Sequence, residues 1–112
     1  MSRNFEKGRS GEQRAAALLA AAGYRIVRRN LQLPGGEIDL LCADGPTVVF
    51  VEVKARWSRS FGSALSGVNA RKRARLRKVA EEYAQIVAPA APIRFDVVAL
   101  DGDRMTLHKN AF

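Results

Sequence analysis

Apolar and polar residues along this chain follow two different spacings. Apolar residues recur every three or four positions in residues 10–22 and 68–88, which is the spacing of an amphipathic helix. Elsewhere they alternate with polar residues or gather in valine-rich runs, as they do in β-strands. The pattern therefore predicts helices over residues 10–22 and 68–88, and strands over residues 24–33, 37–43, 47–56, 93–100 and 105–108.

Capping and turn residues support several of these boundaries. Ser10 followed by Gln13 is a capping box that would begin the first helix, and Gly23 would end it in a left-handed conformation. The run Pro34-Gly35-Gly36 predicts a turn between the first two strands. In the second helix, the residues expected to face the core are Leu76, Ala80, Tyr83 and Val87.

The order helix, three strands, helix, two strands predicts an α/β protein. With 112 residues, the chain has the size of one domain and can bury about two-thirds of its unfolded surface. It contains no internal repeat and no linker-like segment. Residues 1–112 are therefore expected to form a single domain of order αβββαββ, with the polar residues 1–9 flexible.

The charge balance favours a polyanionic partner. Nineteen Lys and Arg residues against eleven Asp and Glu residues give a net charge of +8. Such an excess suits nucleic acid, because each neutralised phosphate releases condensed counterions. An anionic membrane surface is the alternative, and some basic proteins have no polyanionic partner. No secretory signal and no apolar run of transmembrane length is present, so a cytoplasmic protein without membrane insertion is expected.

Three isolated residues have simple structural interpretations. Cys42 is the only cysteine, which excludes an intramolecular disulfide, and its apolar neighbours predict a buried thiol. Asp96 lies in an apolar strand near Arg94, which favours a structural ion pair. His108 is the only histidine and has no evident partner, so neither a zinc site nor a Ser-His-Asp triad is expected.

Three carboxylates and a lysine interrupt the two most apolar strands. Glu37 and Asp39 share one strand face, as do Glu52 and Lys54, because side chains alternate across a strand. Burying charge beside aliphatic side chains is costly unless the charges pair or hold a metal. If the two faces lie on one side of a sheet, the acids converge beside the lysine. The alternative is a half-exposed strand whose Glu52 and Lys54 face solvent.

Converging carboxylates form a hard-oxygen site suited to Mg²⁺ or Mn²⁺. Asp39 and Glu52 would bind the metal, helped by the Val53 carbonyl and water. The metal would acidify a water and offset charge on a phosphate, while Lys54 would orient that water or stabilise the oxyanion. On a basic protein, this chemistry indicates phosphodiester hydrolysis.

Two further acids are candidates for supporting roles. Glu12 lies at the start of the apolar stripe of the first helix and would point toward the sheet, as a further metal ligand or positioning group. It could equally be an acid stabilised by the helix dipole. Glu37 could contact the metal through water or pair with a nearby arginine.

A basic segment on the second helix is the candidate nucleic-acid surface. A basic helix face is often merely solvated, but this density of charge favours phosphate contacts. Lys72 falls near the apolar stripe and could reach inward toward the acids. Trp57 and Phe61, in the preceding loop, could stack on a base or simply pin the loop to the core. The predicted phosphate-binding residues are Arg56, Arg71, Lys72, Arg73, Arg75, Arg77 and Lys78.

Several short blocks together resemble the bacterial YraN-like family over nearly the whole chain. They are Gly11-Glu12, Gly23-Tyr24, Arg29-Asn30, Gly36-Glu37-Ile38-Asp39-Leu40, Phe50-Val51-Glu52-Val53-Lys54 with Arg56, and Arg94-Phe95-Asp96. That family in turn resembles the PD-(D/E)XK restriction-endonuclease-like superfamily and, within it, the archaeal Holliday junction resolvases.

The resemblance implies a fold and a set of catalytic positions. The implied fold is a restriction-endonuclease-like mixed sheet of five strands flanked by helices. Asp39, Glu52 and Lys54 occupy the positions of the superfamily's catalytic residues, and Glu12 matches an acid on the first helix of resolvases. Ile38 departs from the pattern, because it stands where the motif has proline.

Two hypotheses follow. The first is a metal-dependent DNA endonuclease, using Mg²⁺ or Mn²⁺ and acting on branched or otherwise structured DNA. The second is a non-catalytic nucleic-acid-binding protein in recombination, repair or DNA uptake. A scaffold for an acidic protein partner is a third interpretation of the charge alone. Paired cleavage of a two-fold substrate would suit a homodimer.

Overall fold

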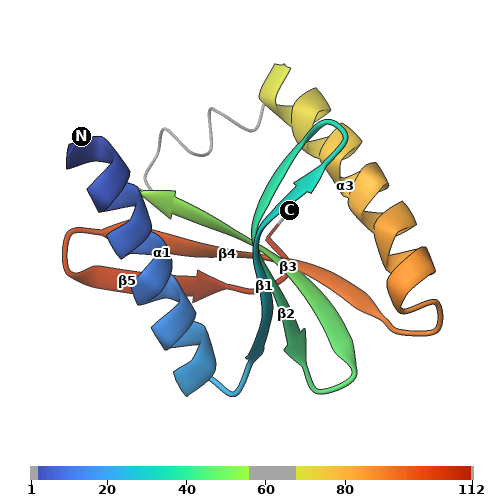
Figure 1. Cartoon of the computed structure of the whole chain (residues 1–112), viewed down its shortest axis with the longest axis horizontal. Helices are drawn as coiled ribbons and strands as arrows, with labels where there is room; N and C mark the ends of the chain where they lie inside the picture. The colour runs from blue at the N-terminus through green and yellow to red at the C-terminus, as the bar shows by residue number, and fades with distance from the viewer. Residues whose placement is uncertain (1–2, 56–67, 112) are drawn as a thin grey trace.

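The structure is a computed structural model that describes the backbone of residues 3–55 and 68–111. Side chains are described for residues 11–54, 71 and 73–111. A sheet lies between two long helices (Figure 1). In chain order the elements are α1 (Arg3–Ala21), β1 (Arg25–Leu33), β2 (Gly36–Asp44), β3 (Thr47–Ala55), α3 (Val68–Val87), β4 (Ile93–Asp101) and β5 (Arg104–His108).

The five strands form one mixed sheet in the order β1-β2-β3-β4-β5. Neighbouring strands are antiparallel except for β3 and β4, which are parallel. A parallel pair needs a long crossover, and α3 lies on the segment that connects these two strands. This arrangement confirms the α/β class and the order αβββαββ, and it is compatible with the restriction-endonuclease-like fold that the resemblance implied.

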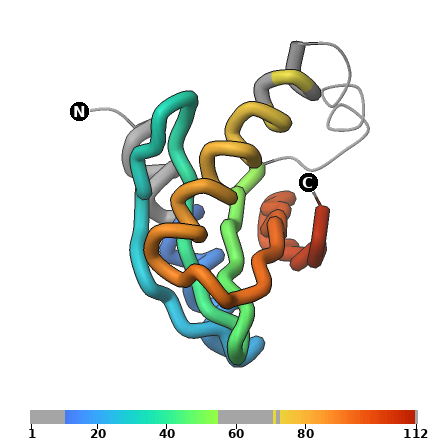
Figure 2. Tube along the Cα trace, turned by 90° about the vertical axis from the view of Figure 1, so that its right-hand side faces the viewer, coloured from blue at the N-terminus to red at the C-terminus, as the bar shows by residue number. Residues whose placement is uncertain are grey.

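The core consists of two apolar layers, one on each face of the sheet. Val49 and Val51 of β3 pack under α1, whereas Phe50, between them, packs under α3. This alternation follows from the two-residue period of a strand. From the side, α3 lies in front of the strands and α1 behind them (Figure 2). Both faces of the sheet are therefore covered, as expected for central strands with few polar positions.

The two layers share the central strands but belong to different helices. The α1 layer contains the buried residues Ala15, Ala16, Leu19, Tyr24, Leu40, Cys42, Val49, Val51, Val98 and Leu100. The α3 layer contains Leu31, Ile38, Leu41, Phe50, Ala80, Ala84 and Phe95. The Phe50 and Phe95 rings stack with centroids 5.2 Å apart. The prediction of a buried Cys42 is confirmed, and its burial raises the pKa of the thiol to about 12.

Helix α1 ends as predicted but begins elsewhere. Gly23 has φ +96°, and the amides of Gly23 and Tyr24 donate to the carbonyls of Ala20 and Leu19. These two bonds form a Schellman motif and satisfy carbonyls at the helix end. The helix begins at Arg3, however, so the predicted capping box at Ser10 is wrong and Ser10 lies inside the helix. Helical hydrogen bonding upstream replaces the role of the cap.

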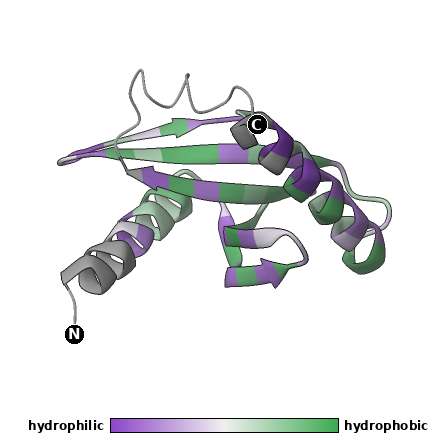
Figure 3. Ribbon diagram, turned by 90° about the horizontal axis from the view of Figure 1, so that it is seen from above, coloured by the Kyte–Doolittle hydropathy of each residue, from purple (hydrophilic) through white to green (hydrophobic). Residues whose placement is uncertain are grey.

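Helix α3 has the predicted bounds to within one residue, but its buried stripe differs at the end. Ala80 and Ala84 are buried, whereas Val87 is 52% exposed. The prediction of Val87 as a core residue is therefore wrong, because Ala84 is the last buried residue of the helix and Ile86 and Val87 after it are exposed. Hydrophilic residues concentrate in the first half of the helix and hydrophobic ones toward its end (Figure 3). Neither α1 nor α3 is long and apolar enough to span a membrane.

The predicted ion pair of Asp96 is confirmed as part of a larger network. Asp96 is fully buried and accepts hydrogen bonds from the Arg94 guanidinium, the Tyr24 hydroxyl and the Asn110 backbone N–H. Arg94 also pairs with Asp44 at 3.0 Å. Burial alone would raise the pKa of Asp96, but these donors outweigh it and hold the pKa below 3.8. The network therefore links β2, β4, the residue Tyr24 before β1 and the segment after β5.

Candidate active site

Strands β2 and β3 separate from each other beside Asp39. Their backbone ladder ends at the pair Leu40–Val51. Two residues further along β3, the Val53 N–H donates to Asp39 Oδ2 at 2.7 Å. The carboxylate thereby takes the place of a backbone acceptor, so a polar side chain is fixed where the two strands diverge.

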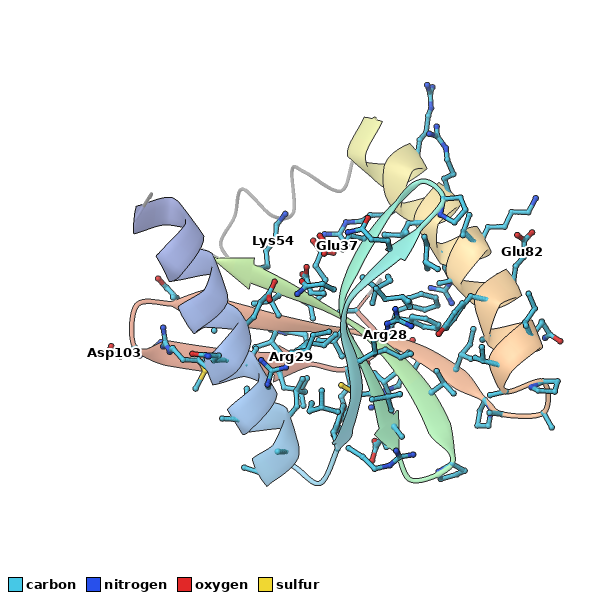
Figure 4. All side chains as sticks on the ribbon, viewed as in Figure 1. Arg28, Arg29, Glu37, Lys54, Glu82 and Asp103 are labelled. Atoms are coloured by element: carbon cyan, nitrogen blue, oxygen red, sulfur yellow. The ribbon has the colours of Figure 1, made fainter. Side chains whose placement is uncertain are left out.

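A cavity of about 270 Å³ opens where the strands separate. Glu37 and Lys54 lie at the same end of the sheet, beside the first half of α3 (Figure 4). The other charged side chains of the cavity come from β2, β3 and α3. Together its charged residues are Glu37, Asp39, Glu52, Lys54 and Arg73.

Glycines in the turn before β2 allow α3 to approach this cavity. A Cβ added to Gly36 would lie 3.3 Å from Leu76 Cδ1, which is tighter than an ordinary contact. Gly35 has φ +95°, a conformation that glycine adopts readily. The turn predicted from the Pro-Gly-Gly run therefore also determines how closely α3 packs, and with it the position of Arg73.

Asp39 is a carboxylate in an unfavourable environment. Burial, together with the negative charges of Glu52, Glu12 and Glu37, raises its pKa from 3.8 to about 6, against the opposing hydrogen bond from the Val53 N–H. Accumulated negative charge around a partly buried carboxylate is the electrostatic condition that a bound cation would relieve.

Glu52 faces Asp39 across the cavity and is contacted by two cations. Arg73 Nη1 lies 2.9 Å from Glu52 Oε1, and Lys54 Nζ lies 3.8 Å from Glu52 Oε2. The Arg73 side chain is only 16% exposed, whereas that of Lys54 is 38% exposed. The arginine is thus directed into the cavity, and the lysine borders it.

Asn30 connects two further acids at the edge of the site. It lies on β1 between the pairs Arg29–Leu40 and Leu31–Ile38, and it has φ +55°. With its amide turned so that the nitrogen faces the carboxylates, Nδ2 lies 3.2 Å from Glu37 Oε2 and 3.2 Å from Glu12 Oε2. The two hydrogens of one amide can satisfy both acids.

The donor chemistry of the cavity fits a hard divalent cation. Asp39 and Glu52 offer carboxylate oxygens from adjacent strands, the ligand type that Mg²⁺ and Mn²⁺ prefer. Among the side chains that the structure describes, no three His, Cys, Asp or Glu residues form a complete metal centre. Water, a backbone carbonyl or substrate oxygens would supply the remaining ligands, as is usual for Mg²⁺.

The basic residues of α3 divide into two groups. Arg71, Arg75 and Lys78 are exposed. Arg73 turns into the cavity, while the Arg77 guanidinium lies 4.6 Å from the Phe95 ring centroid and pairs with Glu81. The helix therefore combines an outward basic face with one inward arginine.

Some predicted residues fall outside the described part of the chain. Arg56, Trp57 and Phe61 belong to residues 56–67, and the Lys72 side chain is likewise not described. Arg28 and Arg29 project from β1 in different directions (Figure 4), and neither borders the cavity.

The structure brings most of the predicted chemistry to one place. Asp39, Glu52, Lys54 and Glu37 border one cavity, and Glu12 reaches it indirectly through Asn30. Sequence reasoning did not single out Asn30. It named Lys72 as a cation that could reach inward, and that side chain lies outside the described part of the chain; among the described cations of α3, the cavity holds Arg73. Asparagine inside a strand, where it is normally unfavourable, is the signal that could have identified Asn30.

The fold and site define an α/β protein with a mixed sheet and an acidic cavity beside a basic helix. The chain belongs to the Uncharacterised protein family UPF0102, whose family model matches residues 11–100. This membership confirms the resemblance to the YraN-like family.

Individual relatives match over most of their length. A UPF0102 protein of Shewanella loihica is 43% identical over 97% of this chain and 96% of its own. One from Moorella thermoacetica is 48% identical over 88% of this chain and 82% of its own. A third, from Symbiobacterium thermophilum, is 46% identical over 94% of both chains. The chain is thus similar to these proteins over most of its length.

Proposed function

We propose that this protein is a metal-dependent DNA endonuclease that hydrolyses phosphodiester bonds, with branched or otherwise structured DNA as its substrate. The observation that carries the proposal is the meeting of Asp39, Glu52 and Lys54 at one cavity. Each comes from a strand that is fixed by backbone pairing. The exposed cations of α3 next to the cavity offer a surface for the sugar-phosphate backbone.

In this proposal, the strand residues divide the work. Asp39 and Glu52 hold Mg²⁺ or Mn²⁺, with Glu37 contributing through water and Glu12 held at the periphery by Asn30. When bound, the cation supplies Lewis-acid stabilisation of the phosphoryl charge and lowers the pKa of a water. The Lys54 ammonium orients the attacking water or donates to the oxyanion that develops on the phosphate. The Val53 N–H keeps the Asp39 carboxylate oriented.

In this proposal, the outward face of α3 binds the substrate. Arg71, Arg75 and Lys78 are exposed and project from the helix whose inward side borders the cavity. Phosphates bound there would place a neighbouring phosphodiester near the carboxylates. Lys72, Arg73, Arg77 and Arg56 are the remaining predicted phosphate ligands.

The test is cleavage of a synthetic four-way junction, and of a plain duplex made from the same strands, with Mg²⁺, Mn²⁺ or EDTA. Wild-type protein should cleave with a metal and not with EDTA. Asp39→Asn and Glu52→Gln should abolish cleavage while DNA binding persists. Lys54→Met should lower the rate by about 100-fold or more, as expected on loss of a group that stabilises transition-state charge.

Asp103→Asn serves as the matched control, because Asp103 is exposed at the far end of the β4–β5 hairpin (Figure 4). It removes the same charge as Asp39→Asn and should cleave like the wild type. Cleavage that survives both Asp39→Asn and Glu52→Gln would reject the assignment.

A nucleic-acid-binding protein without catalysis is the second candidate. The contacts of Glu52 with both Arg73 and Lys54 favour it, because they neutralise the carboxylate without any metal. In this case, DNA affinity should fall steeply with salt, with a log–log slope of about −0.9 per phosphate contact, and no metal should give cleavage. Affinity that hardly depends on salt would argue against both candidates.

A further inference from the structure

Among the described cations of α3, Arg73 is the one that borders the cavity. Its guanidinium lies 2.9 Å from Glu52 Oε1, and only 16% of its side chain is exposed. Arg71, Arg75 and Lys78 on the same helix are exposed. A cation therefore already sits against one of the two carboxylates to which we assign the metal.

The same carboxylate oxygen cannot serve the guanidinium and a divalent cation equally well. A guanidinium 2.9 Å from Glu52 partly neutralises its charge and adds positive charge where the metal would have to enter. Metal binding is thus expected to be weak as long as this ion pair is intact.

A phosphate is the natural competitor for the arginine. Guanidinium binds phosphate and carboxylate with the same two-pronged geometry. Arg73 projects from the helix that bears the exposed basic face, so a backbone phosphate approaching this face comes within its range of motion. Glu52 is 28% exposed and also has Lys54 Nζ 3.8 Å away, so moving Arg73 to a phosphate does not leave this carboxylate as an isolated buried charge.

We propose that Arg73 is an exchangeable counter-ion that neutralises Glu52 in the absence of nucleic acid and moves to a backbone phosphate when DNA binds, which releases Glu52 to hold the divalent cation. This inference rests on the proposed function and extends it to the order of assembly. It makes DNA and metal binding mutually reinforcing, because each ligand removes a competitor of the other.

The first experiment measures Mn²⁺ affinity in the absence of DNA by titration calorimetry. Arg73→Gln should bind Mn²⁺ about tenfold more tightly than the wild type, within the usual range of such couplings. Arg75→Gln is the matched control, since it removes the same charge from an exposed position two residues away and should change the affinity by less than about twofold. Equal affinities in Arg73→Gln and wild type, or equal gains in both variants, would overturn the proposal.

The second experiment uses duplex DNA in EDTA, where neither metal nor cleavage contributes. Glu52→Gln should strengthen DNA binding more than Glu37→Gln, because Glu52 is the carboxylate that lies 2.9 Å from the Arg73 guanidinium. The double variant Glu52→Gln, Arg73→Gln should lose this gain. Additive effects in this double-mutant cycle would contradict the exchange. Arg73→Lys keeps the charge but not the two-pronged geometry, so it should give intermediate values and guards against misfolding of a single variant.

These measurements do not depend on catalysis. A protein that shows the couplings but never cleaves would refute the endonuclease assignment and leave the exchange intact. A protein that cleaves but shows neither coupling would refute the exchange alone.

Discussion

Asp39→Asn should make the metal-free protein more stable at neutral pH while it abolishes cleavage. The pKa of Asp39 is about 6 in the folded protein, against an ordinary value of 3.8. The folded state therefore favours the protonated carboxyl, and its stabilising effect is complete below pH 3.8 and lost as the pH rises through 6. At about 1.4 kcal/mol per pH unit, the shift corresponds to at most about 3 kcal/mol of lost stability at pH 7.

Asparagine removes this penalty and keeps the important contact. Its amide oxygen has the shape of the carboxylate oxygen and can accept the hydrogen bond that the Val53 N–H makes at 2.7 Å. We expect a net gain of about 1–2 kcal/mol, because the neutral acceptor makes a weaker hydrogen bond than the carboxylate.

Urea unfolding in EDTA, between pH 4 and pH 8, measures this effect. Asp39→Asn should be more stable than the wild type at pH 8, and the difference should vanish near pH 4. Glu82→Gln, at an exposed site on α3, removes the same charge and controls for the net charge of +8. A variant that is less stable than the wild type at pH 8, or a difference independent of pH, would refute the reasoning.

Two further predictions concern polar residues outside the cavity wall. Asp96→Asn should lower the free energy of unfolding by about 3 kcal/mol, because it removes the buried charge that accepts three sets of hydrogen bonds and leaves Arg94 with Asp44 as its remaining acidic partner, and chemical denaturation at pH 7 measures the loss. The pKa of Asp96 is lowered in the folded protein, so the stabilisation from its carboxylate is present above about pH 4 and is lost as the pH falls further. A difference in unfolding free energy between variant and wild type that does not change with pH would contradict this. Asn30→Gly, which suits the positive φ but removes the bridge between Glu12 and Glu37, should cost about 1 kcal/mol, and Asn30→Asp should cost more because it adds a third negative charge there. Thermal melts of the two variants and the wild type measure these effects, and melting temperatures equal to that of the wild type would exclude the amide bridge.

The strands could be predicted because their local signals are strong and agree. Every strand lies within one residue of its predicted bounds, and Gly23 ends α1 as expected. Valine-rich runs between glycine turns leave little choice for the backbone. The start of α1 could not be predicted, since Ser10 and Gln13 suit a cap and are also tolerated within a helix.

The cavity was predictable only in part. The spacing of Glu37 and Asp39, and of Glu52 and Lys54, placed each pair on one strand face. Because β2 and β3 are neighbours in the sheet, the two pairs border the same cavity. The divergence of β2 from β3 beside Asp39 has no signature in the sequence pattern. The inward position of Arg73 depends on the rotation of α3 about its axis, which helical periodicity alone does not fix.

The parallel pairing of β3 with β4 has a consequence for the order in which the molecule folds. The antiparallel pairs β1–β2, β2–β3 and β4–β5 join strands that are neighbours in sequence. Pairing β3 with β4 instead closes a loop from Ala55 to Ile93, which costs the most chain entropy, and we expect it to form last. Since α3 travels on that loop, an early intermediate would have its carboxylates in place before the arginine arrives. We therefore expect nascent chains to pass through a stage at which the acids attract stray cations, and completion of the crossover to end it.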